Sequence, residues 1–156
     1  MIVVSNASPL LVLAQADRLS ILKALFEHLL IPEAVRRETV DQCPVPEQRQ
    51  RIEAAIGDFI SVAAPVTVHG FSRNLGQGEQ GVLALALERR ADLLLIDDRK
   101  ARNEADDLGL QCAYTTDVLR LAEHRRIIES AADVVADLRD LRIFLPFASV
   151  PRTTSH

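Results

Sequence analysis

The sequence predicts an α/β protein in which helices cover both faces of a central parallel sheet, giving three α/β/α layers. One observation is the run of four apolar residues at 93–96, which is typical of a strand buried on both faces. This run lies between two segments of helical periodicity, residues 82–90 and 99–108. Short apolar runs also alternate with helical segments along most of the chain, which favours parallel strands joined by right-handed crossovers.

The individual elements follow from the same patterns, taken in chain order. Strands are predicted at residues 2–4, 29–31, 59–62, 93–96 and 110–114. The first helix is predicted to open with Ser8 as its N-cap and Pro9 at its first position. Further helices are predicted over residues 20–27, 33–40, 47–56, 79–90, 99–108, 118–124 and 131–141. In the last helix, Val134, Val135, Leu138 and Leu141 are expected to face inward.

Length and composition restrict the class of protein. The chain has 156 residues, which suits one domain, predicted over residues 1–145, with a loose tail at 146–156. No segment approaches the roughly 18 apolar residues of a membrane span, and the first residues lack the basic start of a signal peptide. We therefore expect a cytoplasmic protein. The formal net charge of −4 disfavours a general polyanion binder, although acids that hold metal ions can still bind phosphate.

Oxygen-bearing side chains follow the predicted strands. Asn6 follows the first strand, and Asp97 and Asp98 follow the central one. Because carboxyl ends of parallel strands gather at one edge, these side chains are expected to meet there, with Glu38 and Glu79 reaching the same edge from nearby helices. Each residue alone also has a structural explanation, since Asp is a favoured N-cap and Asn a favoured turn residue.

Residues 76–81 spell G-x-G-x-x-G and offer a rival interpretation as a dinucleotide-binding loop. That motif needs a strand ending at its first glycine, and residues 71–75 make a poor strand. Glu79 would also bring a carboxylate to the helix N-terminus that should receive pyrophosphate. The same carboxylate suits a cation site better.

Four segments together resemble the PIN-domain family, specifically the DUF3368-type PIN-like proteins related to VapC-like toxin ribonucleases. The matching segments are residues 2–10, residues 30–35 with Glu38, residues 76–87 and residues 91–102. The last is the most specific, and the resemblance spans about residues 2–145. It implies a three-layer PIN-like fold and a metal-dependent endoribonuclease.

The resemblance also implies which residues form the site. The family's acids fall on Asn6, Glu38, Glu79 and Asp98, with Asp97 sharing or replacing the last role. Such a cluster is expected to hold one or two Mg²⁺ or Mn²⁺ ions, because hard cations prefer oxygen ligands. Water activated on the metal would attack the RNA phosphodiester, and Ser8 would orient the first ligand or a water.

Asn6 departs from the family, which has an aspartate at this position. The amide removes one negative charge and one proton acceptor but keeps a carbonyl oxygen that can coordinate. Two hypotheses follow: an active ribonuclease of the toxin type, or a catalytically weakened PIN scaffold that binds RNA or a protein without cutting.

Partners are implied in the same way. A toxin-type ribonuclease is expected to pair with a small antitoxin, and PIN proteins commonly form homodimers. An apolar stripe in the early helices would serve either as a dimer surface or as core; it comprises Leu10, Leu11, Leu22 and Phe26. Basic residues after the central strand would contact the RNA backbone or simply form a solvated helix face; they are Arg99, Lys100 and Arg102.

Overall fold

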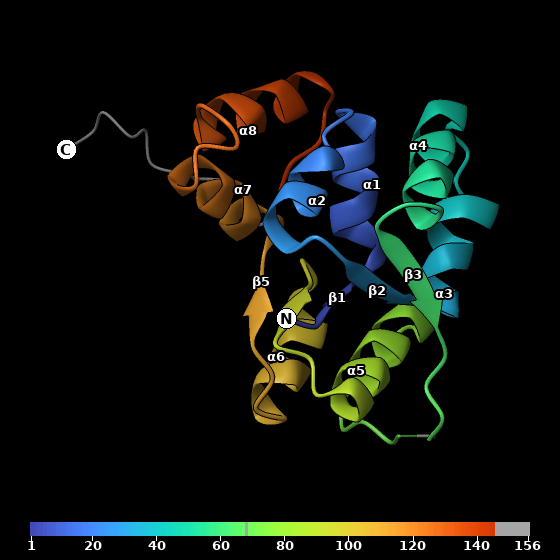
Figure 1. Ribbon diagram of the computed structural model, residues 1–156. Coiled ribbons are helices and arrows are strands. Elements are labelled where there is room, and N and C mark those ends of the chain that lie inside the picture. Colours follow the sequence, from blue (N-terminus) through green and yellow to red (C-terminus); the bar gives the residue numbers. More distant parts are fainter. Residues whose placement is uncertain (68, 146–156) are drawn as a thin grey trace.

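A central parallel sheet organises the chain, as the computed structural model shows for residues 1–67 and 69–145 (Figure 1). Its strands lie in the order β3-β2-β1-β4-β5, and every neighbouring pair is parallel. The strands are β1 (Val3–Ser5), β2 (Leu29–Pro32), β3 (Ile60–Ala63), β4 (Leu93–Leu95) and β5 (Cys112–Ala113). In register, Val4 of β1 is opposite Leu30 on one side and Leu94 on the other. The predicted α/β class and parallel sheet are confirmed.

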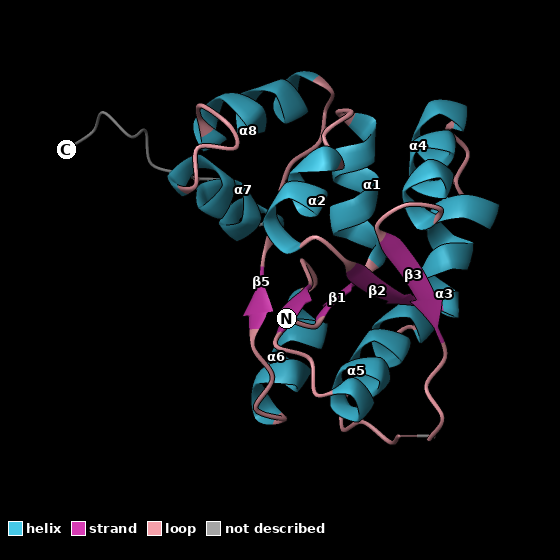
Figure 2. Cartoon of the chain, in the orientation of Figure 1, coloured by secondary structure: helices cyan, strands magenta, loops and turns pink. Residues whose placement is uncertain are grey.

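Helices cover both faces of this sheet, so the molecule has three layers (Figures 1 and 2). One layer contains α1 (Ala7–Gln15), α2 (Ser20–Phe26), α4 (Pro46–Ile56), α7 (Thr115–His124) and α8 (Ala131–Asp140). The opposite layer contains α5 (Gln77–Arg89) and α6 (Arg99–Asp107). The short helix α3 (Glu33–Arg36) follows β2 and packs against α5.

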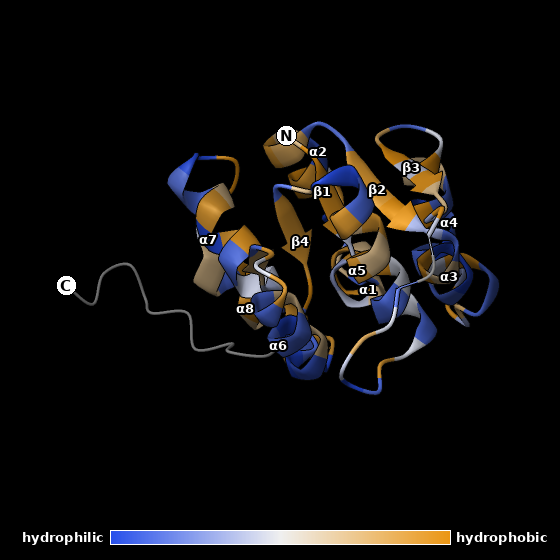
Figure 3. Cartoon of the chain, turned by 90° about the horizontal axis from the view of Figure 1, so that it is seen from below, coloured by the Kyte–Doolittle hydropathy of each residue, from blue (hydrophilic) through white to orange (hydrophobic). Residues whose placement is uncertain are grey.

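The core lies between the layers, where apolar side chains from the strands meet the inner faces of the helices. The strands carry the hydrophobic colour in Figure 3. Val4, Leu94 and Leu95 are fully buried, as expected for strands covered on both sides. Burying one such side chain contributes about 1.5–3 kcal/mol. The stripe proposed as a dimer surface belongs largely to this core: Leu10 and Leu22 are fully buried and Phe26 nearly so.

The start of α1 differs from the prediction. The helix begins at Ala7, with Asn6 rather than Ser8 at the N-cap position, and Pro9 is its third residue. A proline is tolerated there because the first N–H groups of a helix have no partner within the helix. Asn6 has extended backbone but its side chain makes no capping hydrogen bond. The Asn6 side chain is therefore not used to cap α1 and is available at the carboxyl edge of the sheet.

The helix predicted over residues 33–40 is instead α3 followed by a π-helical turn, η1 (Arg37–Asp41). Arg36 bridges the junction by pairing with Glu33 and with Asp41, the latter at 3.0 Å. Such π turns occur frequently at functional sites, and this one carries Glu38.

Two further predictions concern the end of the chain. Leu141 was expected to face inward but follows α8 and is 45 % exposed, whereas Val134, Val135 and Leu138 are buried. The loose tail predicted at 146–156 lies outside the described residues. Within the described part, no helix is long and apolar enough to cross a membrane.

Candidate functional site

The sheet reverses its strand order between β1 and β4, and the candidate site lies at their carboxyl ends. The chain runs from β1 outward to β2 and β3, then returns to β4 on the other side of β1. Asn6 leaves β1 with its backbone N–H donating to the Leu95 carbonyl at 2.9 Å. Asp97 and Asp98 leave β4 directly beside it. Ligands of open α/β sheets bind at such a switch point.

A cleft of about 680 Å³ opens at this switch point. All six residues singled out in the sequence line it: Asn6, Ser8, Glu38, Glu79, Asp97 and Asp98. The rest of its wall is apolar and consists of Ala7, Leu11, Val12 and Phe144. The predicted side chains therefore converge on one cleft, which was the geometric requirement of the metal-site hypothesis. Their catalytic and metal-binding roles stay predictions.

Asp97 is the most firmly fixed of these acids. It is only 6 % exposed and accepts hydrogen bonds from the Thr115 backbone N–H at 2.8 Å and the Thr115 hydroxyl at 2.7 Å. Ser8 donates a third hydrogen bond to Asp97 Oδ2 at 3.3 Å. Asp97 thus joins the ends of β4, α1 and α7, and it fixes the Ser8 hydroxyl. That Ser8 orients the first ligand or a water stays a prediction.

Asn6 brings an unsatisfied oxygen to the cleft. The residue is 5 % exposed, and no described residue donates a hydrogen bond to its Oδ1. An unpaired buried carbonyl costs about 1–3 kcal/mol, so such an atom calls for an explanation. A cation with oxygen ligands would satisfy it.

Glu38 and Glu79 approach the cleft from different helices. Glu79 lies in the first turn of α5, where the helix dipole favours a carboxylate. Burial, and then the negative charge of Glu79, raises the pKa of Glu38 above its usual value. Gly78 allows α5 to pack closely against η1, because a Cβ on Gly78 would overlap Glu38 Oε1. A cation between the carboxylates would relieve their repulsion.

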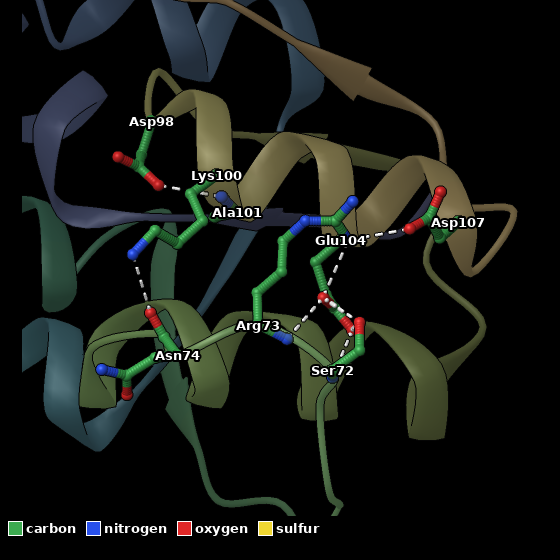
Figure 4. Close-up of polar contacts among 8 residues, drawn as sticks. All are labelled: Ser72, Arg73, Asn74, Asp98, Lys100, Ala101, Glu104 and Asp107. Carbon is green, nitrogen blue, oxygen red and sulfur yellow. Dashed lines mark hydrogen bonds and ion pairs between the residues drawn. The ribbon is translucent and has the colours of Figure 1, made fainter.

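Asp98 serves in part as the helix cap that the sequence offered as the alternative explanation. One of its oxygens accepts the Ala101 backbone N–H at 2.8 Å and caps α6 (Figure 4). Its other oxygen is turned away from the helix (Figure 4). The cap and a metal-binding role are therefore compatible in one carboxylate.

The donor set fits a hard cation that keeps part of its water shell. Among the described residues, no three histidine, cysteine or carboxylate side chains are grouped closely enough to enclose an ion by themselves. Mg²⁺ usually keeps several waters and takes only one or two carboxylates directly. Carboxylates around one cleft, together with the unsatisfied Asn6 oxygen, match that mode of binding.

Glu104, which sequence reasoning missed, ties the acid-bearing elements together (Figure 4). This α6 carboxylate is 3 % exposed and accepts hydrogen bonds from the backbone N–H groups of Ser72 and Arg73 at 3.0 and 3.1 Å. The Ser72 hydroxyl and the Arg73 guanidinium also donate to it, at 2.8 and 2.9 Å. Burial works against the charged form, but these donors outweigh it and lower the pKa of Glu104. The loop before α5, and hence Glu79, is held against the helix that Asp98 caps.

The basic residues predicted to contact RNA are partly used within the protein. Lys100 donates to the Asn74 carbonyl at 3.1 Å, which adds to the loop contact (Figure 4). Arg102 stacks over the Tyr114 ring, with its guanidinium carbon 3.7 Å from the ring centroid. These contacts give both residues a structural role, and their contact with RNA stays a prediction.

The dinucleotide alternative fails on its local geometry. The strand before the glycine motif, β3, ends at Ala63, and a loop separates it from Gly76, the N-cap of α5. The motif therefore has no strand ending at its first glycine. The glycines instead allow close packing, since a Cβ on Gly81 would be 2.9 Å from Pro32 Cβ.

The fold and cleft define an α/β protein with an acidic site at the switch point of a parallel sheet, and comparisons with known proteins agree. A family model described as PIN domain (DUF3368) matches residues 2–152. The chain belongs to this PIN-domain family, whose fold is of the nuclease type.

A solved structure shows the same fold. It is a PilT N-terminus domain protein, SSO1118, from the hyperthermophilic archaeon Sulfolobus solfataricus P2, with a TM-score of 0.53 and 17 % sequence identity. The similarity covers 78 % of this chain and 93 % of the other. No curated protein sequence gives a significant match.

Proposed function

We propose that the protein is a metal-dependent endoribonuclease of the VapC-like toxin type that hydrolyses RNA in the acidic cleft. The observation that carries this proposal is the convergence of Asn6 and four carboxylates on one cleft at the β1/β4 switch point. Membership of a family with a nuclease-type fold supports the reaction class. The identification as a toxin is our inference from the resemblance of the matching segments.

Each side chain has a distinct part in this proposal. Glu38, Glu79 and the free oxygen of Asp98 would hold the cation, and Asn6 would contribute its unpaired carbonyl oxygen. Bound Mg²⁺ or Mn²⁺ would supply Lewis-acid chemistry, lowering the pKa of the attacking water and neutralising charge on the phosphate.

Asp97 and Ser8 act beside the cation ligands. Asp97, held by Thr115, keeps the Ser8 hydroxyl oriented by accepting a hydrogen bond from it. The oxygen lone pairs of Ser8 then remain free to accept a hydrogen bond from a water in the cleft.

RNA cleavage by purified protein in Mg²⁺ or Mn²⁺ tests the proposal. We expect Glu38→Gln and Asp98→Asn to abolish cleavage. Asparagine is as good an N-cap as aspartate, so Asp98→Asn removes the charge while α6 keeps its cap. Glu53→Gln removes an exposed α4 carboxylate that does not line the cleft and serves as the matched control. Equal cleavage by all variants would reject the site.

The second candidate function, a PIN scaffold that binds without cutting, is favoured by one observation, the amide at position 6. Asn6→Asp discriminates the two. If wild-type protein does not cut and this variant does, the natural site is weakened and the scaffold function holds. If both cut, the ribonuclease function holds.

The toxin assignment carries two partner proposals, a small antitoxin that covers the cleft and a second copy of the chain. Growth arrest on expression, relieved by a neighbouring small gene product and absent for Glu38→Gln, would support the antitoxin. Light scattering measures whether the purified protein is a dimer.

A further inference from the structure

An exposed aromatic side chain stands at the acidic cleft. Phe144 lines the cleft and is 72 % exposed. Among the large exposed apolar side chains of the described residues it is the only aromatic one, and no other member of that group lines the cleft. Because burying a phenyl ring is favourable, a flat ligand that enters the cleft and covers this ring would gain free energy.

The backbone on both sides of Phe144 is anchored. After α8 the chain reverses through Arg142, whose φ of 63° is left-handed, and the Ile143 backbone N–H donates to the Leu138 carbonyl at 2.8 Å. Ile143 packs against the core and Leu145 is buried within it. Phe144 lies between these two anchors, and it alone of the three is exposed. The packing of Ile143 and Leu145 therefore holds the backbone of Phe144 beside the cleft.

The apolar wall adjoins the carboxylates. Leu11 and Val12 of α1 are half-buried and line the same cleft as Phe144, while the acids line the rest. A cleft with a cation-binding part and an apolar part matches a ligand that is anionic at one end and flat and aromatic at the other. A nucleotide has that character: its phosphate suits the cation, and its base has a π-face that stacks on aromatic side chains.

We infer that Phe144, with Leu11 and Val12, forms a subsite on which one nucleobase of the RNA stacks, next to the scissile phosphate. This inference rests on the proposed ribonuclease function. In duplex RNA the bases are already stacked and paired, and they cannot reach the ring.

A tryptophan reporter tests the subsite directly, because the chain contains no tryptophan. In Phe144→Trp, single-stranded RNA in the presence of Mg²⁺ is expected to quench the emission, and a duplex of the same sequence is not. Leu141→Trp is the matched control, since Leu141 is exposed on the same turn but does not line the cleft. Its emission is expected to stay unchanged.

Alanine and leucine variants measure the contribution of the ring. Loss of a base-stacking aromatic weakens binding by roughly 5- to 100-fold. We expect Phe144→Ala to weaken single-stranded RNA binding and raise KM by about this factor, Phe144→Leu to recover little of the loss, and Phe144→Tyr to recover most of it. Leu141→Ala should bind as wild type does.

The outcomes separate this inference from the function beneath it. If wild-type protein cuts RNA but Phe144→Ala is unaffected, or if duplex and single strand quench alike, the base subsite is wrong and the ribonuclease function stands. If the emission of Phe144→Trp does not change with RNA but is quenched or shifted by an inhibitory protein, the apolar wall binds a protein partner and the proposed base subsite is wrong. If wild-type protein neither binds nor cuts RNA, both proposals fall.

Discussion

Gly78→Ala tests the carboxylate site through packing, without changing any acid. A methyl group at this buried position of α5 would overlap Glu38 Oε1. Overpacking typically costs about 1–3 kcal/mol when neighbours cannot move, whereas replacing glycine by alanine within a helix gains about 0.5–1 kcal/mol. The overlapping atom belongs to the end of a flexible side chain, so Glu38 can turn away. We expect the free energy of unfolding to change by less than about 1 kcal/mol.

Metal affinity should respond much more strongly to the same substitution. Turning Glu38 away removes one charged ligand, a loss comparable with that of a charged hydrogen-bond partner, about 1.5–3 kcal/mol. This corresponds to a roughly ten- to hundred-fold weaker affinity for Mn²⁺. Calorimetric titration of Mn²⁺ measures the affinity, and thermal unfolding measures stability.

Gly57→Ala is the matched control. Its added Cβ would meet only the Ala54 carbonyl oxygen, at an ordinary 3.6 Å, and its φ of −78° suits any residue. We expect unchanged Mn²⁺ affinity for this variant. A folded Gly78→Ala protein that binds Mn²⁺ as tightly as wild type would refute the reasoning, because Glu38 would then not be a ligand.

Three further predictions follow from the same contacts. The pKa of Glu38 is raised above its ordinary value of 4.5 in the folded, metal-free protein. The contribution of Glu38 to stability is therefore present below pH 4.5 and is lost as pH rises through the raised pKa. Glu38→Gln should raise the melting temperature at pH 7, and this gain should vanish on acidification below pH 4.5. A melting temperature lowered at pH 7 would contradict this. Asn6→Asp should lower the metal-free melting temperature, because it adds a buried charge beside other acids, and should tighten Mn²⁺ binding; an unchanged affinity in calorimetry would exclude Asn6 as a ligand position. Glu104→Gln should loosen the loop before α5 and weaken Mn²⁺ binding severalfold at temperatures well below the melting temperature. Asp107→Asn alters only the exposed partner of Arg73 and should leave Mn²⁺ binding unchanged. Equal Mn²⁺ affinities of the two variants would limit Glu104 to a purely structural role.

The architecture is readable from the sequence because its signals are local. Continuous apolar runs of three or four residues indicate strands buried on both faces, and 3.6-residue periodicity indicates the helices between them. Once the strands are parallel, their carboxyl ends must share an edge. The convergence of Asn6, Asp97 and Asp98 therefore follows from topology without any knowledge of side-chain contacts.

Other features depend on contacts between distant segments or on small differences in backbone energy. Glu104 looks like one more solvated acid in α6, and only its contacts with Ser72 and Arg73, far away in the chain, reveal its role. Phe144 lies between two other apolar residues, so its exposure has no local signature. The choice of a π turn around Glu38 likewise leaves no pattern in the sequence.

Calorimetric titration of Mn²⁺ into wild-type protein beside a Glu38→Gln variant tests the central claim most directly, because it asks whether the cleft binds a cation before any RNA is chosen. The account predicts saturable binding to wild-type protein in a series from pH 5 to 8, tightening with rising pH because Glu38, whose pKa is raised above its ordinary value, must lose its proton to bind the cation. It predicts at least tenfold weaker binding to the variant. Equal binding by both proteins, or no binding by wild-type protein at any pH in this range, would contradict it.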